Sequence, residues 1–135
     1  MSFVLDTSVT MTWCYEEEKT AYSDAVLDQL RGTEAHVPAI WPLEVSNALL
    51  VGERRNRISL VQTLRFLTLI ETFPIRFDEN GVHQALGPVL VLGREHNLTS
   101  YDASYLELAI RLGLPIASQD VRLREAATRV GVLLI

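Results

Sequence analysis

The stretch Ser2-Phe-Val-Leu-Asp-Thr-Ser8 opens the chain with a short apolar run that ends at an aspartate. Phenylalanine and valine favour a β-strand, and the Asp-Thr-Ser sequence favours its end. The stretch therefore predicts a strand over residues 2–5, with Asp6 directly after its carboxyl end.

Short strand-like runs alternate with helical patterns along the rest of the chain. Further strands are expected at 35–37, 73–77, 115–118 and 132–134, and helices at 20–31, 42–52, 59–71, 100–112 and 120–129. Another helix is expected to open at Asp78 and to kink or restart at Pro88, because proline interrupts the helical hydrogen bonds. This alternation predicts an α/β fold, in which helices cover both faces of a central parallel sheet.

Length and composition limit the classes of protein to consider. The chain has 135 residues, 48% of them hydrophobic, which predicts one domain over residues 1–135. The net charge of -5 means that the chain lacks the overall basic character of a typical nucleic-acid binder. A metal-dependent nuclease is still compatible with this charge, because its metal site would be acidic.

The lone Cys14 excludes an internal disulfide and favours a cytoplasmic protein. No secretory signal and no membrane span are expected.

Four carboxylates fall at junctions between the expected elements, where the ligands of open parallel sheets bind. They are Asp6, Glu44, Asp102 and Asp120. Each has a simpler interpretation: Asp6 and Asp120 as helix caps, Asp102 in a capping box with Thr99, and Glu44 as a complement to a helix dipole. If the four gather, they repel one another unless a cation lies between them. Oxygen ligands without thiolate or imidazole favour Mg²⁺ or Mn²⁺, and such ions support phosphodiester hydrolysis.

Four motifs resemble the ordered motifs of PIN-domain ribonucleases, and most closely the VapC-type toxins of toxin–antitoxin pairs. They are Phe3-Val-Leu-Asp-Thr-Ser8, Pro42-Leu-Glu-Val45, Leu98-Thr-Ser-Tyr-Asp-Ala-Ser-Tyr-Leu-Glu-Leu-Ala109 and Ala117-Ser-Gln-Asp-Val-Arg-Leu123. The resemblance spans the whole chain, and the Tyr-Asp-Ala-Ser-Tyr-Leu stretch is its most specific part. Ser118 and Gln119 stand where threonine and asparagine are common in the family.

The resemblance implies a single PIN domain whose parallel sheet has the strand order 3-2-1-4-5. It implies an endoribonuclease that cleaves RNA with a metal-activated water, a homodimer, and a small VapB-like antitoxin as partner. The implied metal-binding and catalytic residues are Asp6, Glu44, Asp102 and Asp120, and the residues expected to support them by hydrogen bonds are Thr7, Ser8 and Ser118.

Arginines supply almost all of the positive charge, and Lys19 is the only lysine. The cluster Arg54, Arg55 and Arg57 is a candidate grip on the RNA backbone, since guanidinium groups match phosphate. Arg122 is a candidate contact for substrate or antitoxin. The alternative is that these arginines are solvated charges favoured near helix C-termini.

Three other functions compete with this interpretation. A haloacid-dehalogenase-type phosphatase would require a second aspartate at position 8, and a response-regulator receiver would require a lysine late in the chain; Ser8 and Lys19 disagree with both. A non-catalytic PIN module that only binds RNA or a protein partner stays open. A further alternative is that the four carboxylates never meet.

Overall fold

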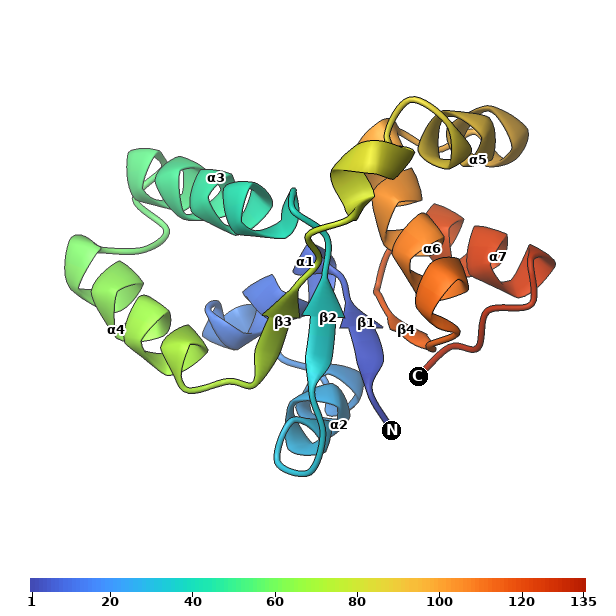
Figure 1. The fold of residues 1–135 in the computed structure, drawn as a ribbon. Helices are drawn as coiled ribbons and strands as arrows, with labels where there is room; N and C mark the ends of the chain where they lie inside the picture. The colour runs from blue at the N-terminus through green and yellow to red at the C-terminus, as the bar shows by residue number, and fades with distance from the viewer.

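A computed structural model describes residues 1–135 and contains a four-stranded parallel sheet in the order β3-β2-β1-β4 (Figure 1). The strands are β1 (Phe3–Leu5), β2 (Ala35–Val37), β3 (Ile75–Phe77) and β4 (Ile116–Ala117). The predicted α/β class and the predicted order of these four strands are confirmed. All four expected strands lie within or at their predicted boundaries.

The fifth expected strand, 132–134, is reduced to a single parallel bridge between Ile116 and Leu134. Ile116 donates to Leu133 O and accepts from Ile135 N, so the segment does lie beside β4, at the predicted fifth position. The pairing does not extend further, because the backbone N–H groups on either side of β4 donate to other partners. Leu114 N donates to Ala109 O, and Ser118 N donates to a tyrosine hydroxyl.

Seven α-helices surround the sheet. They are α1 (Thr7–Thr10), α2 (Ala21–Gln29), α3 (Trp41–Arg54), α4 (Leu60–Glu71), α5 (Pro88–His96), α6 (Ser100–Leu112) and α7 (Val121–Arg129), with 3₁₀ turns η1 (Met11–Trp13), η2 (Glu16–Glu18) and η3 (Gly81–Gln84). In Figure 1, α3 and α4 extend from one side of the sheet, while α5, α6 and α7 lie on the other. None of the helices is both long and apolar enough to cross a membrane.

Two helices begin at the residues that the sequence indicates. Thr20 caps α2 and Ser59 caps α4, and both form capping boxes with the residue three positions on. The prediction of a helix that opens at Asp78 is wrong: residues 79–80 form a bend, followed by the short turn η3. The restart at Pro88 is confirmed, because proline suits the first turn of α5 and lacks the N–H that a continuous helix would need.

The core holds β1 rigidly between its neighbours. All three residues of β1 are fully buried, and β2 and β4 flank the strand on either side. Helix α6 packs against β1 and contributes the fully buried Leu106 and Leu108. The carboxyl end of β1, where Asp6 begins, is therefore fixed by packing on several sides.

Candidate functional site

Two aspartates follow two neighbouring strands of the sheet, β1 and the edge strand β4. Asp6 follows β1 and Asp120 comes three residues after β4 ends, while Asp6 N donates to Ala117 O at 3.0 Å. Glu44 lies in the first turn of α3, and Asp102 lies in the first turn of α6. The fold thus places all four predicted carboxylates at the beginnings of helices around the carboxyl ends of the strands.

Asp6 is a buried carboxylate held by two hydroxyl groups. Its residue is 4% exposed, and its Oδ2 accepts hydrogen bonds from Ser8 Oγ at 2.6 Å and from Ser118 Oγ at 2.8 Å. Burial raises the pKa of Asp6, whereas the two hydroxyls oppose that rise. Because both side-chain bonds fall on Oδ2, Oδ1 has no side-chain donor.

Ser118 is itself fixed from three directions. Its amide donates to Tyr22 Oη at 3.2 Å, its carbonyl accepts from Arg124 Nη1 at 2.9 Å, and its Oγ accepts from Asp120 N at 3.0 Å. The residue is fully buried. Ser118 therefore ties the backbone of Asp120 to the carboxylate of Asp6, which is the supporting position that the motif resemblance implies.

Glu44 is anchored by a single oxygen. Its Oε1 accepts from Tyr105 Oη at 2.6 Å and from Thr7 Oγ1 at 3.2 Å, and Oε2 forms no hydrogen bond. Partial burial raises the pKa of Glu44, and the neighbouring charge of Asp6 raises it further. Of the two hydroxyls expected to bond near Asp6, that of Ser8 donates to Asp6, and that of Thr7 donates to Glu44.

Asp102 carries a carboxylate whose charge is disfavoured by its surroundings. Burial raises its pKa to about 6, with further contributions from Asp120, Asp6 and Glu44 in that order. Its amide donates to Thr99 Oγ1 at 3.1 Å, but the return bond of a capping box does not form. The simple capping interpretation therefore accounts for Thr99 and leaves the carboxylate of Asp102 unexplained.

Asp120 is both a helix cap and a member of the acidic group. Its Oδ1 accepts from Leu123 N at 2.9 Å, so it caps α7 as the sequence suggested. Its charge also raises the pKa of Asp6 and of Asp102, which shows that it lies within electrostatic reach of both. One oxygen caps the helix and the other is free of hydrogen bonds.

The four carboxylates form an acidic cluster that no basic side chain neutralises. The groups that shift the pKa values of Asp6, Glu44 and Asp102 include other carboxylates and hydroxyls, but no arginine, lysine or histidine. No three acidic, histidine or cysteine side chains stand at the spacing of a completed metal site. A wide, all-oxygen site still fits Mg²⁺, which keeps several waters and takes only one or two carboxylates directly.

The predicted basic contacts divide into two groups. Arg57 donates to Glu17 at 2.8 Å and to Glu18 at 3.2 Å, and its guanidinium lies 4.0 Å above the ring of Tyr15. Its charge is therefore already paired. The other three predicted contacts, Arg54, Arg55 and Arg122, are exposed and form no ion pair.

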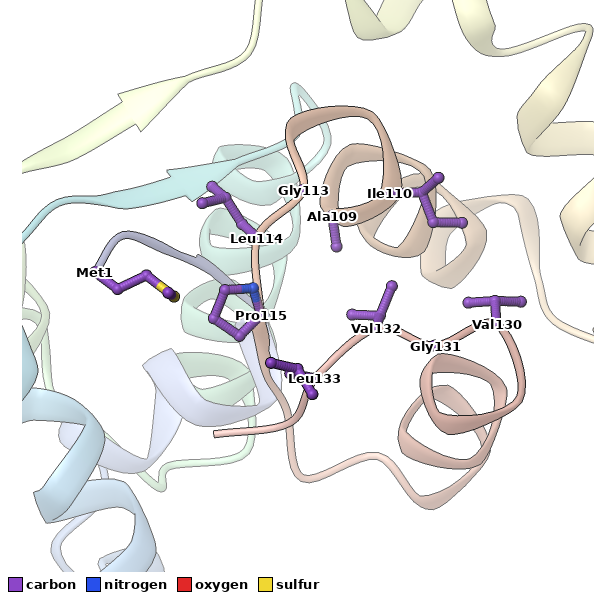
Figure 2. Close-up of a pocket in the computed structure, with 10 residues that line it drawn as sticks. All are labelled: Met1, Ala109, Ile110, Gly113, Leu114, Pro115, Val130, Gly131, Val132 and Leu133. Atoms are coloured by element: carbon purple, nitrogen blue, oxygen red, sulfur yellow. The ribbon is translucent and has the colours of Figure 1, made fainter.

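A separate apolar hollow lies at the amino ends of the strands, opposite the acidic cluster. It has a volume of about 310 Å³ and is lined by residues that include Met1, Pro115 and Leu133 (Figure 2). Met1 precedes β1 and Pro115 precedes β4, so the hollow lies at the amino ends of the strands. None of the four carboxylates lines it, and its lining carries no titratable side chain.

Sequence reasoning missed the tyrosines of the site. Tyr105 and Tyr22 lie in the helices expected at 100–112 and 20–31 and receive no role from the sequence, whereas their hydroxyls bond Glu44 and Ser118. The available signal was the spacing of Asp102 and Tyr105, since residues three apart share a helix face.

Comparison with known proteins gives matches over nearly the full chain. The PIN domain family matches residues 3–129. Ribonuclease VapC3 of Pyrobaculum aerophilum is 25% identical over 125 residues, which cover 93% of this chain and 94% of that protein.

Two solved structures share the fold. The crystal structure of PAE2754 from Pyrobaculum aerophilum has a TM-score of 0.68 at 22% identity, covering 93% of this chain and 84% of that one. The structure of VapBC2 from Rickettsia felis, bound to a DNA fragment from their promoter, has a TM-score of 0.69 at 11% identity and covers 100% and 98%. At these identities the structural matches establish the fold alone.

Proposed function

Since this chain belongs to the PIN-domain family, we propose that it is a metal-dependent endoribonuclease and the toxin of a toxin–antitoxin pair. The proposed domain spans residues 1–135, and the proposed metal-binding and catalytic residues are Asp6, Glu44, Asp102 and Asp120. The proposed cofactor is Mg²⁺ or Mn²⁺.

The observation that carries the proposal is the uncompensated charge of the acidic cluster. Burying or crowding carboxylates raises their pKa values and costs folding free energy, and the fold does not offset this cost with a basic residue. Such an arrangement is expected where a divalent cation binds. The similarity to Ribonuclease VapC3 supports RNA as the substrate class.

The residues of the chain prepare this site for phosphodiester hydrolysis. A bound divalent cation would supply an activated water and would stabilise the leaving oxygen. Ser8 and Ser118 orient Asp6, and Tyr105 and Thr7 orient Glu44, so that each acid has one oxygen fixed and one available. Preorganised ligands of this kind reduce the cost of binding the metal and the substrate.

Exposed apolar residues support protein partners, for which the proposal names a VapB-like antitoxin and a second copy of the chain. Helix α4 exposes Leu60, Val61 and Leu64, and the region of α5 exposes Leu86 and Leu90. Leu60 and Leu64 lie one turn apart on α4, and gathered exposed apolar residues are typical of interfaces. The VapBC2 structure, which shares the fold of this chain, supports a VapB-like partner. The proposed location is the cytoplasm, where an RNA substrate would be met.

Cleavage of a panel of labelled RNAs, including tRNAs, tests the proposal. The purified chain is assayed with Mg²⁺ or Mn²⁺, with a chelator, and as the Asp102→Asn variant. Cleavage that requires both the metal and Asp102 is the expected result. Metal-bound, folded protein that binds RNA without cutting any member of the panel would favour the second candidate, a non-catalytic PIN module.

A further inference from the structure

Helix α6 presents two polar groups to the acidic cluster, one turn apart. Asp102 and Tyr105 are three residues apart and therefore share a face of the helix. Tyr105 is 0% exposed, and its hydroxyl donates to Glu44 Oε1 at 2.6 Å and lies 2.7 Å from Thr7 Oγ1. One buried hydroxyl thus joins α1, α3 and α6.

This bond is the only hydrogen bond between α3 and α6. The other polar contacts of α3 lead elsewhere, such as Trp41 Nε1 to Thr10 Oγ1 at 3.1 Å. Glu44 belongs to α3 and Asp102 to α6. The hydroxyl of Tyr105 is therefore the one hydrogen-bonded link between the helix of Glu44 and the helix of Asp102.

A phenylalanine would fill the same space without a polar group to bury. A buried hydroxyl costs free energy unless it is hydrogen-bonded, so its presence indicates a polar role. A phenol hydroxyl is protonated at neutral pH, so it can donate to Glu44 Oε1 and fix that oxygen in place.

We propose that Tyr105 is a positioning residue, which holds Glu44 by Oε1 and leaves Oε2 to the cation. The inference rests on the proposed function, because it assumes that the acidic cluster binds a divalent ion. It assigns to Tyr105 an effect on metal affinity that acts through Glu44 and not through the general stability of the fold.

A double-mutant cycle on metal affinity separates these two roles. Mn²⁺ binding to the metal-free protein is measured by calorimetry for the wild type, Tyr105→Phe, Glu44→Ala and the double variant, with thermal melts to verify folding. Tyr101→Phe is the matched control, since it makes the same change on the same helix at an exposed tyrosine whose hydroxyl has no partner. Thr7→Val provides a second probe that leaves Tyr105 intact.

Tyr105→Phe is expected to weaken Mn²⁺ binding about 10-fold, as is usual for partners of metal ligands, and to change it less than about twofold when Glu44 is already alanine. Thr7→Val is expected to follow the same dependence on Glu44, and Tyr101→Phe is expected to match the wild type. Wild-type affinity in Tyr105→Phe, or an equal loss in both backgrounds, would overturn the inference.

The variant Asp102→Asn distinguishes failure of the inference from failure of the proposed function. Mn²⁺ binding that depends on Asp102 but not on Tyr105 would overturn the positioning role alone. Mn²⁺ binding that is absent, or unaffected by Asp102→Asn, would overturn the metal site and the positioning role together.

Discussion

Arg111 and Asp78 form a two-pronged ion pair, with Nη1 3.1 Å from Oδ1 and Nη2 2.8 Å from Oδ2. The same guanidinium also donates to Glu107, with Nε 2.9 Å from Oε2. The pair joins the residue after β3 to the last turn of α6. Both acidic side chains are largely buried, and Arg111 holds the pKa of Asp78 below its usual range.

Replacing Arg111 by methionine is expected to lower the free energy of unfolding by about 3–5 kcal/mol, because it leaves two buried carboxylates without a cationic partner. Arg111→Lys is expected to recover only part of this loss, since lysine lacks the planar fork. Urea denaturation at pH 7 measures both variants. A methionine variant as stable as the wild type would show that the network contributes nothing.

The acidic cluster predicts a pH dependence of the stability of the metal-free protein. The pKa of Asp102 is about 6 in the folded state and 3.8 in its ordinary state, so its favourable contribution is present below pH 3.8 and is lost as the pH rises through about 6. Asp102→Asn is therefore expected to be more stable than the wild type at pH 7.5, by roughly 2 kcal/mol for a partly exposed group.

This difference in unfolding free energy is measured in chelator between pH 4 and pH 7.5, and it should shrink toward pH 4. Adding Mn²⁺ should reverse the order at pH 7.5, since only the wild type gains binding energy. A difference that is constant with pH would mean that Asp102 does not titrate in the predicted range.

The contacts of Ser118 predict a loss that is both structural and functional. Ser118→Ala removes a donor to the buried Asp6 and an acceptor for Asp120 N, at an expected cost of about 1–3 kcal/mol in stability. Mn²⁺ affinity should fall by about 10-fold, because Asp6 loses its orientation. Ser118→Thr keeps the hydroxyl and is the control; an equal loss of affinity in both variants would argue against the hydrogen bond as the cause.

Gly52 is a position where alanine is expected to destabilise the protein, although alanine favours helices more than glycine does. It lies inside α3, where replacement by alanine ordinarily stabilises a helix by about 1 kcal/mol. A Cβ there would collide with Tyr15 Oη and lie 2.9 Å from Ile58 Cγ2, so Gly52→Ala is expected to destabilise the protein by about 1–3 kcal/mol.

Thermal melts of Gly52→Ala and of the double variant Gly52→Ala/Tyr15→Phe measure this effect. Removal of the tyrosine hydroxyl should restore part of the lost stability, compared with Tyr15→Phe alone. A stabilised Gly52→Ala protein would mean that Tyr15 moves away at no cost.

Much of the fold was predictable because local signals agreed with the global topology. Capping residues Thr20 and Ser59 marked the beginnings of α2 and α4, and the apolar run before Asp6 marked β1. The helix proposed at Asp78 failed because the carboxylate of that residue is engaged by Arg111, 33 positions away. No local pattern contains such a contact.

The candidate site shows the same division. The positions of Asp6, Glu44, Asp102 and Asp120 at element junctions could be read from the sequence. The spacing of Asp102 and Tyr105 indicates a shared helix face, but the bond of the Tyr105 hydroxyl to Glu44 could not be read, because Glu44 lies 61 positions away on another helix.

A crystal structure of the protein grown with Mn²⁺ tests the central claim most directly, through the anomalous signal of the metal. The account predicts an anomalous peak within coordination distance of Asp6 and Asp102 carboxylate oxygens, with Glu44 and Asp120 reaching it directly or through water. Ordered carboxylates at saturating Mn²⁺ with no peak among them, or a peak elsewhere in the molecule, would contradict it.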